Sequence, residues 1–141
     1  MRVYPDTSLL VTLYVLGQHT AKVSEQMALR PDLIVTPFHH CEFAHAIEGL
    51  VFRNSISVQE ARLVMEAFER DSTHGLWLAT PFPQASFRTC ITLAQRFTAR
   101  LGCRTLDALH VAAALDLEAE EFWTFDERQK QLAAAAGLRI G

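Results

Sequence analysis

Four carboxylates fall at positions where a chain of alternating strands and helices would bring them together. Asp6 directly follows a short apolar run that we interpret as a buried strand, and Asp126 directly follows another. Glu42 and Asp107 lie near the starts of two other segments with helical periodicity. In an open α/β sheet, strand ends and helix starts converge on one crevice, which is where ligands bind. The spacing therefore predicts one site that collects acids from four distant segments.

Carboxylates gathered in this way predict a divalent-cation site. Like charges held close together repel one another and raise the pKa of some members unless a cation neutralises them. A set of oxygen ligands without histidine or cysteine favours Mg²⁺ or Mn²⁺ over zinc. Such an ion among acids is typical of phosphodiester chemistry. We therefore expect a metal-dependent hydrolase that acts on a phosphodiester backbone.

Each aspartate also has a simpler interpretation as a helix cap. Asp6 and Asp126 precede helical patterns, and Asp107 lies in the first turn of another, where an acid is favoured. Taken singly, each is better explained as a cap than as a ligand. Glu42 is harder to explain in this way, because it lies in an apolar stretch with no lysine or arginine within one turn. The equivalent placement of all four acids favours the site.

The composition is that of a globular protein. The 141 residues, half of them hydrophobic, are enough for one domain that spans residues 1–141. The net charge of −3 argues against binding nucleic acid through bulk positive charge, so RNA contacts would be local or supplied by a partner. Three cysteines without paired spacing predict neither a disulfide framework nor a zinc site. Charged residues interrupt every apolar stretch, so we expect no membrane span, no signal peptide and a cytoplasmic protein.

The hydrophobic pattern predicts strands that alternate with helices. Short apolar runs bounded by proline or polar residues read as strands, and apolar positions that recur every three or four residues read as helices. Ser57 with Glu60 three residues later predicts a capping box at one helix start. The alternation predicts an α/β fold, a three-layer sandwich in which helices cover both faces of a central parallel sheet. The expected strands are 2–5, 33–36, 76–80, 122–125 and 138–140, and the expected helices are 7–16, 20–29, 39–53, 57–73, 84–101, 105–117 and 127–136.

Four short motifs occur in order along the chain. They are Asp6-Thr7-Ser8, Glu42 within the helical run 41–47, Arg104-Thr105-Leu106-Asp107-Ala108-Leu109-His110, and Thr124-Phe125-Asp126. Together they resemble the motifs of the PIN domain. The closest likeness is to the VapC-type toxins of bacterial toxin–antitoxin systems, and it extends over the whole chain. The resemblance implies a PIN-like parallel-sheet α/β sandwich whose acids bind one or two Mg²⁺ or Mn²⁺ ions and cleave single-stranded RNA.

The resemblance also implies residue roles and partners. The three aspartates would bind the metal, and Glu42 would orient or deprotonate the attacking water or hold a second metal. The products would carry 5′-phosphate and 3′-hydroxyl ends. The implied partners are an RNA substrate, a cognate antitoxin and a second copy of the chain in a homodimer. The residues that carry over are the acidic quartet Asp6, Glu42, Asp107 and Asp126, with Ser8 and Thr124 in supporting polar roles.

A row of arginines is a weaker candidate for RNA contact. Arg96, Arg100 and Arg104 continue a four-residue spacing that starts at Arg88. Side chains four residues apart line one face of a helix, so this ridge would lead a phosphate backbone towards Asp107. The alternative is a solvated helix face, and it stays open because surface helices commonly carry such charges.

Three further polar residues have simple interpretations. His110 lies one turn after Asp107, where it either touches the site or packs in the core, and packing is the better supported of the two. Glu48 and Asp116 lie further from strand ends and read as solvent-facing charges.

Other functions are also compatible with this pattern. A PIN nuclease that is not a toxin, or a catalytically silent RNA-binding or interaction module, would share the fold. Retention of the four acids counts against the silent module, because burying like charges without a function is costly. A haloacid-dehalogenase-like (HAD-like) phosphatase also places an aspartate after its first strand. That chemistry usually requires a second aspartate two residues later, where Ser8 stands here.

Overall fold

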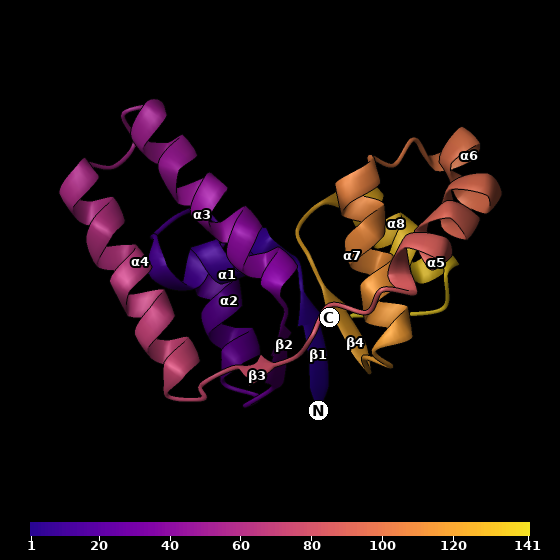
Figure 1. Ribbon diagram of the computed structural model, residues 1–141, viewed down its shortest axis with the longest axis horizontal. Helices are drawn as coiled ribbons and strands as arrows, with labels where there is room; N and C mark the ends of the chain where they lie inside the picture. The colour runs from indigo at the N-terminus through magenta and orange to yellow at the C-terminus, as the bar shows by residue number, and fades with distance from the viewer.

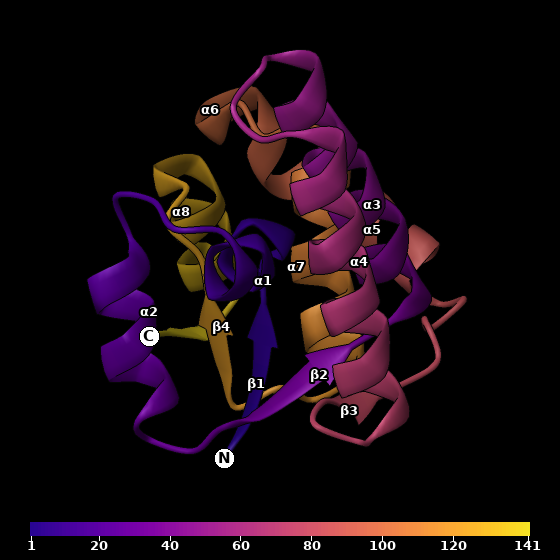
Figure 2. The ribbon, with the colours of Figure 1, turned by 90° about the vertical axis from the view of Figure 1, so that its left-hand side faces the viewer.

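The computed structural model describes all residues, 1–141, and contains a five-stranded sheet (Figures 1 and 2). The strands lie in the order β3-β2-β1-β4-β5, and every neighbouring pair is parallel. The predicted parallel sheet is therefore confirmed. The strands are β1 (Arg2–Pro5), β2 (Asp32–Val35), β3 (Leu78–Ala79), β4 (Glu121–Trp123) and β5 (Arg139–Ile140).

Helices cover both faces of this sheet, as the three-layer prediction requires (Figure 1). Helices α1 to α4 lie on one side and α5 to α8 on the other. No helix combines the length and the apolar character that crossing a membrane requires. The helices are α1 (Thr7–Tyr14), α2 (Thr20–Met27), α3 (Pro37–Phe52), α4 (Val58–Thr73), α5 (Ser86–Leu93), the π-helix η1 (Ala94–Thr98), α6 (Ala99–Leu101), α7 (Thr105–Asp116) and α8 (Glu127–Ala135).

Side chains that alternate along the strands build a separate core on each face of the sheet. Tyr4 and Phe122 pack with buried residues of α5, α7 and α8. Val3 and Trp123, one position away on the same two strands, pack with buried residues of α1, α3 and α4. Successive strand residues point to opposite faces, so short runs of consecutive apolar residues fill both cores.

Strand β3 is shorter than the run predicted over 76–80. The backbone N–H of Leu76 donates to the carbonyl of Asp71 at 2.9 Å, which keeps it in the turn that ends α4. Only Leu78–Ala79 is assigned as strand, although the N–H of Thr80 still donates to the Val35 carbonyl at 3.0 Å. The edge strand of the sheet is therefore very short.

The helix predicted over 84–101 is interrupted by a π-helical turn. It starts as α5, passes through η1 and ends as α6 before Gly102, which has a φ of +68°. A π turn inserts an extra residue, so side chains before and after it no longer follow one row at four-residue spacing. Arg104 lies beyond Gly102, at the N-cap position of α7, instead of belonging to the same helix. The prediction of one continuous arginine ridge is therefore wrong.

Pro5 ends the central strand without leaving an unpaired backbone group. Proline has no N–H, but the next N–H, that of Asp6, donates to the Trp123 carbonyl of β4 at 2.8 Å. On the other side, Nε2 of the buried His39 donates to the Pro5 carbonyl at 2.9 Å. Nδ1 of His39 accepts from the backbone N–H of Thr36 at 3.0 Å. A histidine at the start of α3 therefore holds the end of β1, next to Asp6.

Candidate active site

The strand order of the sheet changes direction between β1 and β4, so these two neighbouring strands form a topological switch point. From β1 the chain moves outward through β2 to β3, and it then returns to the other side for β4 and β5. Ligands of open parallel sheets bind at such a switch point, beyond the carboxyl ends of the strands. Asp6 follows β1 and Asp126 comes soon after β4, and the last residues of these strands pair as Pro5 with Trp123. The two aspartates therefore flank the switch point.

Asp6 lies at the N-cap position of α1 but does not cap the helix. No helical N–H reaches its carboxylate. Its Oδ2 instead accepts a hydrogen bond from the Ser8 hydroxyl at 2.6 Å. Ser8, predicted to support the site, thus orients the Asp6 carboxylate, and the cap interpretation of Asp6 does not hold.

Asp126 does cap a helix, through one of its two oxygens. Oδ1 accepts from the backbone N–H of Gln129 at 2.8 Å, at the start of α8. The N–H of Asp126 donates to the hydroxyl of Thr124 at 3.0 Å, so Thr124 fixes the turn that carries the acid. The side-chain amide of Gln129 donates to the backbone carbonyl of Asp107 at 3.2 Å. These contacts tie Asp126 on α8 to Asp107 on α7.

The three aspartates act on one another electrostatically. Burial raises the pKa of the Asp107 carboxyl, and the negative charges of Asp6 and Asp126 raise it further. Arg104 opposes this shift, but its Nε lies 3.6 Å from Asp107 and its side chain is 82% exposed, so the ion pair is weak. The pKa of the Cys103 thiol is also raised, first by burial and then by Asp107 and Asp126. Burial is the largest cause of both pKa shifts, and nearby aspartates add to each.

Glu42, on α3, is linked to this region by hydrogen bonds. Its Oε1 accepts from the hydroxyl of Thr7 at 2.8 Å and also contacts Nε2 of His110. Burial on its own would raise the pKa of the Glu42 carboxyl, but the contacts from His110 and Thr7 outweigh burial and lower it. Thr7 follows Asp6 directly in the chain. Glu42 is therefore an ionised carboxylate beside the aspartates.

His110 and Tyr4 both contact Glu42 or its partners, although the sequence pattern favoured packing for His110 and did not single out Tyr4. His110 is 1% exposed and stacks on Phe38 with ring centroids 4.3 Å apart, so it packs in the core as predicted. Its Nε2 also contacts Glu42, and its Nδ1 lies 3.0 Å from the Tyr4 hydroxyl. The feature of the sequence that could have placed His110 at the site is its position one turn after Asp107. The contact with Glu42 joins residues 68 positions apart, which periodicity does not predict.

The carboxylates match a hard divalent cation in donor type and in charge. Asp6, Asp107 and Asp126 offer oxygen ligands only, and Asp107 is raised in pKa by the other two. As placed in this structure, no three His, Cys, Asp or Glu side chains lie together so that they could hold one metal ion. Mg²⁺ does not require three protein ligands, because it usually keeps several waters and binds through one or two carboxylates. The residues therefore fit Mg²⁺ or Mn²⁺ and do not form a structural zinc site.

The candidate RNA-binding arginines differ in their surroundings. The guanidinium carbons of Arg96 and Arg100 lie 5.0 Å and 6.0 Å from the ring centre of the buried Phe97. Such cation–π contacts position the exposed side chains and leave their N–H donors free. Of the three arginines, only Arg104 pairs with an acid of the site, Asp107.

The two acids outside the site are exposed, as predicted. Glu48 lies on the outer face of α3. Asp116 is also exposed, but it accepts hydrogen bonds from the hydroxyls of Ser86 at 2.7 Å and Thr89 at 3.0 Å. Asp116 therefore joins the end of α7 to the start of α5, a structural role that its position in the sequence did not reveal.

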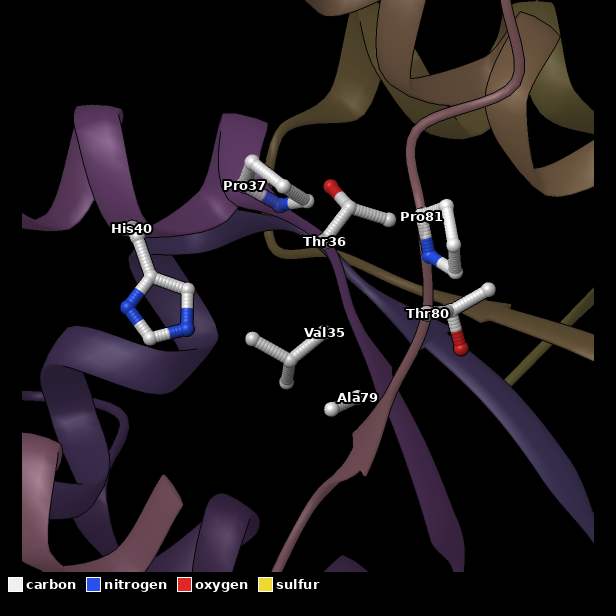
Figure 3. A pocket seen from close by; sticks show the side chains of 7 residues that line it. All are labelled: Val35, Thr36, Pro37, His40, Ala79, Thr80 and Pro81. Atoms are coloured by element: carbon white, nitrogen blue, oxygen red, sulfur yellow. The ribbon is translucent and has the colours of Figure 1, made fainter. Parts of the chain in front are cut away.

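Two hollows adjoin this edge of the sheet, and only one involves an acid of the site. The first, of about 400 Å³, lies at the ends of β2 and β3, with His40 on one side and Thr80 and Pro81 on the other (Figure 3). None of the four acids lines it. The second, of about 460 Å³, includes Glu42 in its wall. Its lining residues are Phe38, Cys41, Glu42, His45 and Leu106.

A family comparison identifies the fold independently. The sequence matches the PIN domain family over residues 3–135. The chain belongs to the PIN domain family. The matched part of this PIN domain includes the four acids and both predicted supporting residues. Among curated proteins, no sequence match was found.

Solved structures share this PIN-domain architecture at low sequence identity. Mycobacterium tuberculosis VapC20, described as a toxin that cleaves the sarcin-ricin loop, superposes with a TM-score of 0.69 and 15% identity over 96% of this chain and 95% of that chain. VapBC2 from Rickettsia felis, bound to a DNA fragment from its promoter, gives a TM-score of 0.70 and 12% identity over 100% of this chain and 98% of that one. FitAcB from Neisseria gonorrhoeae gives a TM-score of 0.69 and 13% identity over 98% of this chain and 95% of that one. At these identities, the likeness establishes the fold alone.

Proposed function

We propose that this PIN domain is a metal-dependent endoribonuclease that hydrolyses phosphodiester bonds of single-stranded RNA. The proposal is carried by the PIN-domain match over residues 3–135 together with the placement of Asp6 and Asp126 at the switch point, where burial and their charges raise the pKa of Asp107. Mutually repelling carboxylates destabilise a fold unless a cation neutralises them. A protein that gathers such groups is therefore built to bind a cation, and the donor set favours Mg²⁺, with Mn²⁺ as the alternative.

The three aspartates would hold this ion. When bound, the cation lowers the pKa of a bound water and neutralises charge that develops on the phosphate during in-line displacement. The protein orients two of the three carboxylates before any ligand arrives, which limits the reorganisation that binding requires. Ser8 orients Asp6 and the N–H of Gln129 orients Asp126, whereas Asp107 has only its weak ion pair with Arg104.

Glu42 would orient the attacking water and accept its proton. A general base must be ionised before the reaction, and the contacts with His110 and Thr7, which lower the pKa of Glu42, keep it ionised. The same contacts make Glu42 a weaker base, so it relies on the cation to acidify the water. Those two donors both bind Oε1, so Oε2 is left for the water. Glu42 also lines a hollow with Phe38 and Leu106, which gives the water a place to approach it.

We further propose that the enzyme is the toxin of a toxin–antitoxin pair, acts in the cytoplasm as a homodimer, and is neutralised by a cognate antitoxin. VapC20, VapBC2 and FitAcB, which share the fold, support this assignment. Exposed apolar side chains support a protein partner, because such surfaces are typical of interfaces. A hollow of about 360 Å³ between α1 and α4 adjoins them. The exposed side chains are Leu16, Phe52, Val58 and Leu63.

Cleavage of RNA by purified protein, with Mg²⁺ and with EDTA, tests the nuclease assignment. We expect cleavage only with Mg²⁺, and we expect Asp6→Asn to lower the rate by at least about 100-fold, because it removes a metal ligand. Asp32→Asn is the matched control, since Asp32 starts β2 at the opposite end of the sheet and contacts only the N-terminal amine, at 3.6 Å. Equal activity of Asp6→Asn and the wild type would contradict the proposal. Growth inhibition relieved by the product of the neighbouring reading frame would test the toxin role.

A further inference from the structure

A chain of polar contacts runs from the core of the protein to Glu42. The hydroxyl of Tyr4, on the central strand β1, lies 3.0 Å from Nδ1 of His110. The other ring nitrogen of His110, Nε2, contacts Oε1 of Glu42. The hydroxyl of Thr7 donates to the same Oε1 at 2.8 Å. One imidazole therefore connects β1, α7 and α3.

Packing leaves the His110 ring little freedom. Tyr4 is 0% exposed and His110 is 1% exposed. The imidazole stacks on Phe38 at 4.3 Å with an interplanar angle of 18°, and the Tyr4 ring meets it edge-on at 5.6 Å. All residues of α7 from Ala108 to Ala114 are buried. Close-packed interiors hold side chains in single rotamers, so the two nitrogens keep their partners.

The contacts of His110 fix which of its nitrogens carries a hydrogen. An ionised carboxylate only accepts hydrogen bonds, so the Nε2 that faces Glu42 must be the donor. In the neutral imidazole, Nδ1 then accepts from the hydroxyl of Tyr4 at 3.0 Å. The opposite tautomer would turn a nitrogen lone pair towards the carboxylate. The partner of one ring nitrogen thus determines the role of the other, so Tyr4 acts on Glu42 through His110.

Both donors bind the same oxygen of Glu42. Oε1 receives the contacts from Thr7 and His110, and Oε2 has no hydrogen bond within the protein. The side chain of Glu42 is 26% exposed and forms part of the wall of the hollow of about 460 Å³. Two donors on one oxygen restrict rotation of the carboxylate, so the other oxygen is held in one direction.

We propose that His110 is a positioning residue that holds the Glu42 carboxylate with Oε2 directed at the attacking water, and that Tyr4 fixes the tautomer of His110. The catalytic consequence rests on the proposed ribonuclease function. His110 acts through Glu42 and contacts neither the metal nor the RNA. An apolar side chain of similar size would serve a purely structural role equally well, so substitutions distinguish the two roles.

Two substitutions of His110 either keep or remove the donor. His110→Gln retains an N–H for Glu42 and an oxygen for Tyr4, whereas His110→Leu removes both at similar volume. We expect kcat to fall by about 10- to 100-fold in His110→Leu with KM for RNA unchanged, and His110→Gln to restore most of the rate. Thermal unfolding of each variant checks that it is folded. An unchanged kcat in folded His110→Leu, or equal losses in both variants, would overturn the proposal.

Tyr4→Phe tests whether Tyr4 acts through His110. On its own it should lower kcat by roughly tenfold or less, and it should have no further effect when combined with His110→Leu, because residues on one path are not additive. Tyr14→Phe is the matched control. It removes a hydroxyl at the C-terminal end of α1 that donates to Asp71 of α4 at 2.6 Å, and it should leave kcat unchanged. Effects of Tyr4→Phe and His110→Leu that multiply would overturn the proposed path.

A spectroscopic measurement tests the arrangement without catalysis. Long-range ¹H–¹⁵N spectra of the metal-free protein should show His110 with a hydrogen on Nε2, and Tyr4→Phe should shift the Nδ1 resonance. A hydrogen on Nδ1 alone would overturn the proposal. If the wild type cleaves no RNA, the proposed function fails, and these spectra still determine whether His110 donates to Glu42.

Discussion

The carboxyls of Asp107 and Glu42 carry the same charge and have opposite pKa shifts. Burial acts on both, but Asp107 faces two other aspartates, whereas Glu42 accepts two hydrogen bonds. Repulsion disfavours the charged form of a carboxyl, and donated hydrogen bonds favour it. The two residues are therefore suited to different tasks, because a repelled carboxyl benefits from a cation and a stabilised carboxylate is ready to act as a base.

Asparagine at position 107 should make the metal-free protein more stable while abolishing cleavage. Folding raises the pKa of the Asp107 carboxyl, so the protonated carboxyl favours the folded state at low pH. This contribution to the free energy of unfolding is lost as the pH rises through the pKa of the folded state. At neutral pH the ionised group destabilises the fold, and Asp107→Asn relieves this cost. We expect the Tm of Asp107→Asn in EDTA to exceed that of the wild type by a few degrees, and Mg²⁺ to raise the wild-type Tm more.

Thermal unfolding with and without Mg²⁺ measures both effects. Asp32→Asn is again the control, because Asp32 lies outside the site and its loss should not change the response to Mg²⁺. A lower Tm for Asp107→Asn than for the wild type in EDTA would show that the aspartates do not destabilise one another.

Among the elements, α3 starts with an unusual capping box. The side chain of Thr36 caps the first turn, and His39 takes the third helical position, where glutamate or glutamine is usual. His39 is fully buried and also donates to the carbonyl of Pro5. One side chain therefore caps the helix that carries Glu42 and holds the strand end that precedes Asp6.

Acid should weaken the fold through this buried histidine. Burial, and then the nearby His110 and His40, lower the pKa of His39 from 6.5 to about 3, against the opposing hydrogen bond to Pro5. The unfolded chain binds a proton near the ordinary value and the folded protein does not, so stability is present above pH 6.5 and declines as the pH falls. Between pH 6.5 and 5 the loss of unfolding free energy is about 2 kcal/mol.

His39→Gln is the variant that isolates this effect. Glutamine is an ordinary residue for the third position of a capping box, and it offers an acceptor and a donor without titrating. Urea unfolding at pH 7 and pH 5 should show a smaller pH dependence for His39→Gln than for the wild type, by roughly the amount above. If the free energy of unfolding depended on pH equally in the two proteins, titratable groups other than His39 would be responsible for the loss of stability in acid.

Most elements could be predicted from local pattern because their signals are local. The capping box of α4 is present as expected, with the N–H of Glu60 donating to the Ser57 hydroxyl at 3.0 Å. The π turn at Ala94–Thr98 could not be predicted, because its sequence has ordinary helical periodicity. The fold class and the placement of Asp6 and Asp126 after strand ends were also predictable, since these depend on topology. The contact of Glu42 with His110 was not, because it depends on how α3 and α7 pack.

For the molecule as a whole, the net charge of −3 requires that any RNA contact be local. The exposed guanidinium groups of Arg96 and Arg100 are the best candidates for such a contact, because both are held over Phe97 and neither pairs with an acid. We expect the double charge reversal Arg96→Glu and Arg100→Glu, made in the inactive Asp6→Asn protein, to weaken RNA binding. The loss of affinity should be the same for RNAs of different sequence. The salt dependence of log K should also fall by about 0.7 for each lost contact.

Arg62→Glu is the matched control for this experiment. Arg62 lies on α4, is 65% exposed and pairs only with Glu66 on its own helix. Binding isotherms at several salt concentrations would measure the difference. An equal affinity in the double variant and the control would show that the arginines form a solvated face.

The four acids do not come from one side of the sheet. Glu42 belongs to the layer of helices that includes α3, Asp107 to the opposite layer that includes α7, and Asp6 and Asp126 to strand ends between them. The spacing of the acids is therefore set by how both layers seat on the sheet. A ligand that moved the two layers of helices apart would change the distances between the acids without binding to any of them. The rate of cleavage would therefore report on how the layers pack against the sheet.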